Sequence, residues 1–164
     1  MTTRVLILMR HGKSAYPTGI ADHDRPLAPR GEREATLAGE WIRAEQPPVG
    51  AVLCSTSVRT RETLAMTRID APTTFVEDIY GGSPEQLIKL IREVDDSVDT
   101  LLLIGHAPGM PYTTWELASN RYSEPAEQVS RKFPTSAMAV LEFDKSWADI
   151  DTGTADLVSF HIPR

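Results

Sequence analysis

The fold is decided near the start of the chain by the stretch Val5-Leu6-Ile7-Leu8-Met9-Arg10-His11-Gly12. Five consecutive apolar residues predict a strand that is buried on both faces, as in a parallel sheet with helices on each side. The run ends at Arg10 and His11, two residues that a buried strand disfavours. A cation and an imidazole therefore lie at the carboxyl end of a strand, where open α/β sheets bind their ligands. Gly12 allows the backbone to turn tightly just beyond them.

The rest of the chain alternates in the same way between strand and helix patterns. Apolar runs predict further strands, and apolar residues at helical spacing predict helices between them. We expect an α/β fold, a three-layer α/β/α sandwich around a mostly parallel sheet with right-handed crossovers. The expected strands are 5–9, 51–54, 73–76, 100–104, 137–143 and 157–162. The expected helices are 30–45, 83–94 and 112–120, together with a helix after the second strand that carries Arg59 in its first turn. We expect residues 16–29 to form an irregular loop and residues 121–133 to form a polar surface connection.

Composition and charge narrow the class of protein. The chain has 164 residues, 41% of them apolar and 24% charged, values typical of one soluble globular domain, which we expect to span residues 1–164. No apolar run approaches the roughly 18 residues of a membrane span, and the N-terminus has no signal-peptide pattern, so we expect a cytoplasmic protein without membrane association. The net charge of −6 disfavours nucleic acid as a partner but leaves room for a local basic pocket.

A disulfide or a metal site has little support in the sequence. Cys54 is the single cysteine, so it cannot form an internal disulfide, and it ends an apolar run, as a small core residue does. His11 and His106 could hold a metal ion, but no acidic or thiol ligand stands at a recognisable spacing from them. We therefore expect no metal.

Cationic and imidazole side chains recur at the carboxyl ends of three predicted strands. Arg10 and His11 follow the first strand. Arg59 stands shortly after the second, and His106 follows the strand at 100–104. The positive charges of such a cluster would repel one another unless an anion were bound among them. Each contact between opposite charges at about 4 Å contributes roughly 4 kcal/mol of Coulomb energy before desolvation is subtracted. A phosphoryl group fits, because a guanidinium binds two phosphate oxygens at once and no carboxylate trio for magnesium is present. An imidazole among cations stays unprotonated, which makes it a nucleophile near neutral pH.

Each of these residues also has a purely structural interpretation. A single histidine after a strand is usually a hydrogen-bonded loop residue, and Arg59 could be an ordinary arginine on a helix surface. For His23, in a proline-flanked loop, and for His161, near the C-terminus, we prefer the structural interpretation. The joint occurrence of three such strand ends is what favours an active site.

These segments resemble the histidine phosphatases, also called the phosphoglycerate-mutase-like superfamily. The stretch Arg10-His11-Gly12-Lys13-Ser14 is similar to the R-H-G motif of that superfamily, Ser55-Thr56-Ser57-Val58-Arg59 to its S-P-x-x-R segment, and Gly105-His106-Ala107-Pro108-Gly109 to its G-H-x-P-G segment. Asp24-Arg25-Pro26-Leu27-Ala28-Pro29-Arg30-Gly31 resembles the R-P-L-x-x-x-G loop of the SixA-type phosphohistidine phosphatases, and Phe133-Pro134-Thr135-Ser136-Ala137 resembles their late P-T-x-A strand entry. The resemblance spans nearly the whole chain, and it departs from the pattern where Thr56 replaces a proline and Ala107 an asparagine.

The resemblance implies a phosphoglycerate-mutase-like fold and a phosphatase. His11 would attack phosphorus and become a phosphohistidine, which water would then hydrolyse to release inorganic phosphate. The phosphoryl oxygens would be held by Arg10, Arg59 and His106. Lys13, Ser14 and Arg25 are expected to contribute to substrate binding, and no metal or organic cofactor is required.

The resemblance leaves the proton donor for the leaving group open. In many relatives it is a glutamate in a segment resembling E-x-x-x-G, which Glu77-Asp78-Ile79-Tyr80-Gly81 matches. Asp24, in the loop after the first strand, is the other carboxylate considered. Solvent is a third possibility, because the leaving imidazole of a phosphoramidate can be protonated by water. We favour Glu77.

The substrate that we expect is a phosphorylated protein histidine. The short chain motivates this, since it has no room for the large helical insertion that roofs the small-molecule sites of bigger relatives. One alternative is a phosphatase for small phosphate esters, and another is a non-catalytic module that binds phosphate. The sequence carries no signature of the oligomeric state.

Overall fold

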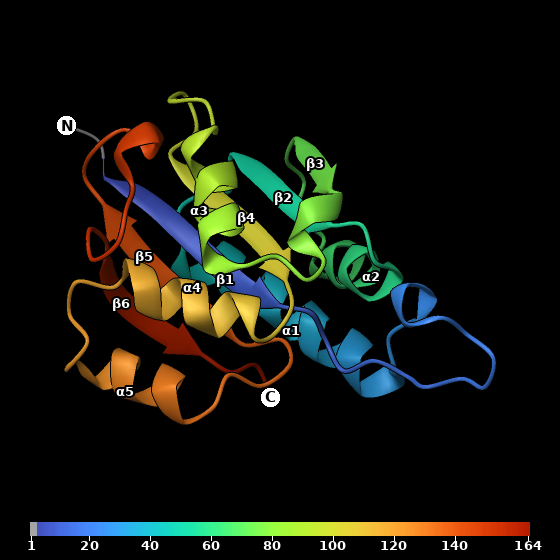
Figure 1. Ribbon diagram of the computed structural model, residues 1–164. Coiled ribbons are helices and arrows are strands. Elements are labelled where there is room, and N and C mark those ends of the chain that lie inside the picture. Colours follow the sequence, from blue (N-terminus) through green and yellow to red (C-terminus); the bar gives the residue numbers. More distant parts are fainter. Residues whose placement is uncertain (1–2) are drawn as a thin grey trace.

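The long apolar runs of the sequence become neighbouring strands of one sheet. A computed structural model of the protein describes residues 3–164, and its six strands pair in the order β3-β2-β4-β1-β5-β6 (Figure 1). The first four of these strands run parallel, whereas β5 is antiparallel to β1 and β6 is antiparallel to β5. The expected α/β class and mostly parallel sheet are therefore confirmed. The strands are β1 (Arg4–Arg10), β2 (Ala51–Ser55), β3 (Thr73–Val76), β4 (Thr100–Gly105), β5 (Met138–Phe143) and β6 (Asp156–His161).

Helices cover both faces of the sheet, because alternate residues of the buried strands project to opposite sides. In β1, Leu6 and Leu8 belong to one core cluster and Ile7 and Met9 to the other. All four side chains are fully buried, and each contributes about 1.5–3 kcal/mol relative to an exposed position. The first cluster packs under α3 (Pro84–Arg92), α4 (Gly109–Leu117) and α5 (Glu124–Arg131), and the second under α1 (Pro29–Glu45) and α2 (Val58–Thr67) (Figure 1).

Local sequence signals set where these helices begin. Ser83 and Gln86 form a reciprocal capping box at the start of α3. Ser57 caps α2 by accepting a hydrogen bond from the Thr60 amide, which places Arg59 in the first helical turn, as predicted. Only two residues separate β2 from α2. Arg59 therefore stays close to the carboxyl end of the sheet.

Residues 121–133 differ from the prediction of a polar surface connection, because they contain the helix α5. Ser123 caps this helix, and Ala126 and Val129, three residues apart, are buried against the core. Two buried apolar residues make too short a stripe to be recognised as a helical pattern. The helix predicted at 112–120 also begins and ends earlier, at Gly109 and Leu117.

The loop at 16–29 is irregular, as predicted, apart from one 3-10 turn, η1 (Asp22–Asp24). Its base is held by a hydrogen bond from the Ala15 amide to the Pro26 carbonyl at 2.8 Å and by a bridge between Ser14 and Leu27. Residues 16–22 are exposed. The loop is thus pinned at its base and open at its tip.

Cys54 is fully buried in β2, where the pattern predicts a core residue. Burial raises the pKa of its thiol to about 12, so it stays protonated. Across residues 3–164, no helix combines the length and the apolar character needed to cross a membrane.

Candidate active site

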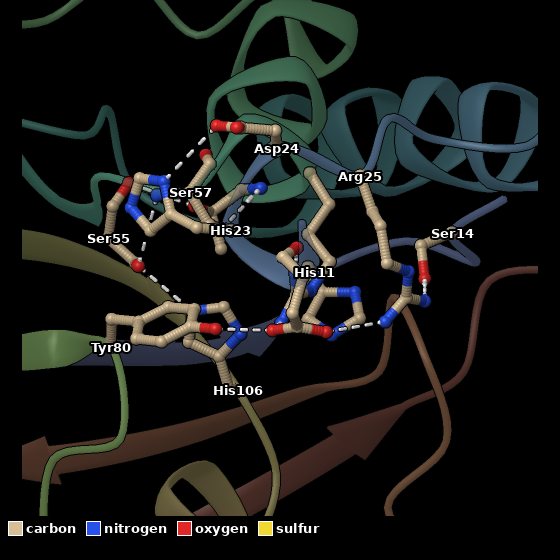
Figure 2. Close-up of polar contacts among 12 residues, drawn as sticks. His11, Ser14, His23, Asp24, Arg25, Ser55, Ser57, Tyr80 and His106 are labelled. Carbon is tan, nitrogen blue, oxygen red and sulfur yellow. Dashed lines mark hydrogen bonds and ion pairs between the residues drawn. The ribbon is translucent and has the colours of Figure 1, made fainter. Parts of the chain in front are cut away.

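The sheet brings the two motif histidines together. β1 and β4 are neighbours, with Arg10 paired to Gly105, and the His11 amide donates a hydrogen bond to the Gly105 carbonyl at 3.0 Å. His11 and His106 therefore leave adjacent strands side by side, with ring centroids 5.3 Å apart. Figure 2 shows the two rings next to each other, with Tyr80 beside His106.

His11 is buried, with 7% of its surface exposed. Its Nδ1 lies 2.7 Å from the Gly12 carbonyl oxygen, which can only accept a hydrogen bond. Nδ1 therefore carries the proton, and the lone pair of the neutral ring is on Nε2. Burial, helped by the nearby His106, Arg59 and Arg10, lowers the pKa of His11 to about 3. The ring is thus held unprotonated at neutral pH.

Gly12 is required by close packing against the first turn of α1. A Cβ atom at this position would lie 2.9 Å from the carbonyl oxygen of Gly31. The Gly12 amide also donates to the Thr63 hydroxyl of α2 at 2.9 Å. The segment that follows His11 is therefore clamped between α1 and α2.

His106 is held by a hydrogen bond between its Nε2 and the hydroxyl of Ser55, at 2.8 Å. The ring of Tyr80 meets it edge-on, with centroids 5.3 Å apart. Burial and the charge of Arg59 lower the pKa of His106 to about 4. Ser55 is the last residue of β2, so three strands contribute to the same cluster.

Both predicted arginines reach this cluster. Arg10 anchors its guanidinium by donating from Nη1 to the Phe133 carbonyl at 2.9 Å, and burial lowers its pKa. Arg59 is only 7% exposed, so the alternative of an ordinary helix-surface arginine does not hold. Its Nη1 donates to the Asp22 backbone carbonyl at 2.7 Å, and its Nη2 lies 3.1 Å from the Asp22 carboxylate.

The three expected substrate-binding residues lie at the base of the loop but differ in exposure. Ser14 is buried and accepts a hydrogen bond from Arg25, which also donates to the Asp22 carboxylate at 2.7 Å (Figure 2). Lys13 is exposed, with its ammonium 5.7 Å from the centroid of the Tyr16 ring. Ser14 and Arg25 are therefore linked to Arg59 through Asp22, whereas Lys13 lies on the outer surface.

Neither carboxylate considered as the proton donor contacts the cluster. Glu77 is exposed at the start of the 3-10 turn η2 (Glu77–Ile79). Asp24 is exposed as well and pairs with His23, 3.7 Å away, rather than with His11 (Figure 2). Within residues 3–164, neither group makes a hydrogen bond or ion pair with the arginines or the two clustered histidines.

Sequence reasoning missed Asp22 and Tyr80. The Asp22 carboxylate accepts hydrogen bonds from Tyr80, Arg25 and Arg59, which hold its pKa well below the usual range. The hydrogen bond between Tyr80 and the Asp22 carboxylate raises the pKa of Tyr80. Asp22 stands two residues before Asp24, and only the turn η1 decides which of the two carboxylates faces the arginines. No sequence signal distinguished them.

The two departures from the family pattern have visible consequences. Thr56 places its hydroxyl 2.9 Å from Nε2 of His23, so the segment before α2 is tied to the loop. Ala107 offers no side-chain hydrogen bond, and Nδ1 of His106 is buried without a partner in residues 3–164. Throughout those residues, no group of three His, Cys, Asp or Glu side chains is placed to hold a metal ion.

Comparisons with known proteins agree with this geometry. The sequence profile of the histidine phosphatase superfamily (branch 1) matches residues 6–79. An uncharacterized protein of Mycobacterium tuberculosis is 56% identical over 158 residues, which are 95% of this chain and 100% of that protein. The structure of a candidate phosphohistidine phosphatase SixA from Nakamurella multipartitia superposes with a TM-score of 0.92 at 36% identity, covering 99% of this chain and 98% of that one. The phosphohistidine phosphatase SixA of Escherichia coli is 25% identical over 147 residues, 86% of each chain.

The fold, the paired histidines and these matches define the class: the chain belongs to the histidine phosphatase superfamily. Within that superfamily its branch is the SixA type. Membership supports a phosphatase, a hydrolase that acts on a phosphorylated substrate.

Proposed function

We propose that the protein is a phosphatase in which His11 carries the phosphoryl group between substrate and water. Nε2 of His11 attacks phosphorus, forming an N–P bond while the bond from phosphorus to the leaving group breaks and the leaving group takes up a proton. Water then attacks the same phosphorus, the N–P bond breaks, and inorganic phosphate leaves. The observation that carries this proposal is the hydrogen bond from His11 Nδ1 to the Gly12 carbonyl, which leaves the lone pair on Nε2.

The groups around His11 have complementary roles. Arg10, Arg59 and His106 bind the equatorial phosphoryl oxygens and stabilise the charge of a loose transition state. Arg10 is suited to this because its Nη1 is already fixed by the Phe133 carbonyl, so little entropy is lost on binding. For the proton donor to the leaving group we propose Glu77, on the resemblance of its segment to that of related phosphatases; it lies exposed at the start of η2 and would have to reach the leaving group from outside the hydrogen-bonded cluster.

We propose a protein phosphohistidine as the substrate. A groove of about 660 Å³ lies between α4 and α5, lined mainly by apolar side chains that include Tyr112 and Trp115. Its wall contains Ala107 and Pro108, directly after His106, and Phe133, whose carbonyl binds Arg10. The groove therefore has walls formed by residues next to the site along the chain, and it is much larger than a phosphoryl group, which supports a polypeptide as the attached group. The SixA-type relatives support the same substrate class.

Trapping the covalent intermediate tests the proposal. A histidine-phosphorylated protein domain labelled with ³²P is mixed with the protein, and the reaction is quenched in base within milliseconds to seconds. We expect a label on the protein that is stable in base and labile in acid, and that is absent from His11→Ala. His23→Ala is the matched control, since His23 lies in the loop and should still be labelled. Full turnover by His11→Ala would refute the mechanism.

The substrate is tested by comparing rates. We expect kcat/KM for the histidine-phosphorylated domain to exceed that for p-nitrophenyl phosphate by at least tenfold. A preference for the small ester would instead support the phosphatase for small molecules. Phosphate binding with no turnover of either substrate would support the non-catalytic module.

A further inference from the structure

The carboxylate of Asp22 occupies hydrogen-bond donors that suit a phosphoryl group. Arg59 directs both terminal nitrogens at this residue, Nη1 to its backbone carbonyl at 2.7 Å and Nη2 to its carboxylate at 3.1 Å. Arg25 donates to the other carboxylate oxygen at 2.7 Å, and the hydroxyl of Tyr80 donates as well. Donors from three separate segments converge on one anionic group, as they do on a bound oxyanion.

Arg59 cannot use the same N–H groups for Asp22 and for a substrate. A guanidinium binds two phosphoryl oxygens either side-on, through Nε and one terminal nitrogen, or end-on, through the fork formed by Nη1 and Nη2. In this structure that fork is taken, and Asp22 is the carboxylate that pairs with Arg59 within residues 3–164. Departure of Asp22 from Arg59 is therefore a condition of end-on phosphoryl binding through Nη1 and Nη2.

The loop allows Asp22 to leave. Its side chain is 52% exposed, so no packed neighbours enclose it. It stands in the three-residue turn η1, which has no side-chain cap. The base of the loop is pinned by the bond between Ala15 and Pro26, while residues 16–22 are exposed. The tip can therefore move without disturbing the strand that carries His11.

The charge of the two competing anions, the Asp22 carboxylate and a phosphoryl group, determines which of them binds Arg59. A carboxylate carries one negative charge, whereas a phosphoryl group carries about −1.5 to −2 near neutral pH and has three acceptor oxygens. Asp22 bonds to Arg59 but not to Arg10, so it neutralises only part of the cluster. A phosphorylated substrate can satisfy both guanidiniums and so displaces Asp22. Phosphate, the product, then competes with the returning carboxylate for the same donors.

We propose that Asp22 is a positioning residue that occupies the phosphoryl-binding fork of Arg59 in the free protein, yields it to the substrate, and returns to displace inorganic phosphate. This inference rests on the proposed function for the identity of the ligand. The carboxylate keeps Arg59 aligned between turnovers and weakens the binding of product. The apparent Kd for phosphate is the intrinsic Kd divided by the fraction of free molecules in which Asp22 does not hold Arg59.

Calorimetric titration with inorganic phosphate tests this. We expect Asp22→Asn to bind phosphate at least about fivefold more tightly than the wild type, which corresponds to Asp22 holding Arg59 in about four-fifths of free molecules. Asp24→Asn is the matched control: it makes the same charge change two residues along, at an exposed carboxylate that pairs with His23, and should leave phosphate affinity unchanged. Asp22→Ala, which cannot accept from Arg59, should tighten binding as Asp22→Asn does.

Equal or weaker phosphate binding by both Asp22 variants would overturn the proposal, because Asp22 would then only hold Arg59 in place. An equal gain in Asp24→Asn would also overturn it, since net loop charge would be the cause. The titration needs no turnover, so it is independent of the labelling of His11. If His11 becomes labelled with ³²P but the Asp22 variants bind phosphate no more tightly than the wild type, only this inference is refuted. If the Asp22 variants bind phosphate more tightly but His11 is never labelled, only the proposed mechanism is refuted.

Discussion

At the scale of single residues, the state of His11 follows from its surroundings. An exposed histidine is partly protonated near neutral pH, whereas this ring is buried and faces His106, Arg59 and Arg10. Desolvation and like charge both disfavour the imidazolium. The Gly12 carbonyl then selects the tautomer. The result is a neutral, oriented imidazole with its lone pair on Nε2, the state that the proposed nucleophilic attack requires.

Arg59 should matter far more than its neighbour Arg61. We expect Arg59→Ala to lower kcat/KM at least about 30-fold, equivalent to about 2 kcal/mol, because a charged hydrogen-bond partner of the transition state is lost. Arg61→Ala is the control, since Arg61 is exposed, donates to the Thr56 carbonyl and lies over the Phe75 ring, away from the histidines. Steady-state kinetics check this, and a change of less than twofold in Arg59→Ala would show that Arg59 does not act in the reaction.

The proposed role of Glu77 as proton donor is tested by varying the basicity of the leaving group. If it donates the proton, Glu77→Gln should slow esters with basic leaving groups by about 10² or more and leave p-nitrophenyl phosphate nearly unchanged, because a good leaving group needs no acid. Asp78→Asn, the adjacent exposed carboxylate, provides the control. Rates that are equal in wild type and Glu77→Gln for all leaving groups would assign the proton to solvent.

At the scale of elements, the site is built from segments that leave the sheet at one edge. β1, β2 and β4 deliver His11, Ser55 and His106, and the start of α2 adds Arg59. The helices α4 and α5 then form the groove beside them. Under the proposed function, strand ends form the phosphoryl site and helices form a separate surface for the attached group.

Substitutions at two exposed tyrosines test whether the groove binds the attached protein separately from the phosphoryl site. Tyr112 lines the groove and is 62% exposed, whereas Tyr122 is fully exposed and lies outside the groove. We expect Tyr112→Glu to raise KM at least tenfold for a histidine-phosphorylated domain, because a carboxylate disrupts an apolar contact. Hydrolysis of p-nitrophenyl phosphate should change little, and Tyr122→Glu should affect neither substrate. Parallel losses on both substrates in Tyr112→Glu would argue against a separate docking surface.

Across the whole molecule, the buried His11 and the half-buried His106 make stability depend on pH. Their pKa values in the folded protein are about 3 for His11 and about 4 for His106, below the roughly 6.5 of an exposed histidine. Between these values the unfolded chain binds more protons than the folded protein. Their contribution to stability is therefore present above about pH 6.5 and is lost as the pH falls toward the folded pKa values.

Denaturant titrations at pH 7.5 and pH 5 check this expectation. The free energy of unfolding should fall with acidity, with a slope that approaches about 1.4 kcal/mol per pH unit for each histidine. The double variant His11→Gln/His106→Gln should have a shallower slope. An identical slope in the two proteins would mean that other groups cause the acid sensitivity.

The sequence predicted most elements because their signals are local. Five apolar residues before Arg10 indicate a doubly buried strand wherever they occur, and the serines before α2 and α3 satisfy the first amides of those helices. α5 was missed because its buried stripe is only Ala126 and Val129, so its stability comes from the core that it covers rather than from its own pattern.

Hydrophobic patterning alone indicates where the buried strands stop, and so places Arg10, His11 and His106 at strand ends, and the serine cap places Arg59 at the start of the helix after β2. Tertiary structure alone decided that Asp22 rather than Asp24 meets Arg59, and that Tyr80 rather than Glu77 contacts His106. Those choices depend on the path of two irregular segments with little periodicity, whose side chains are oriented by the groups they meet in space.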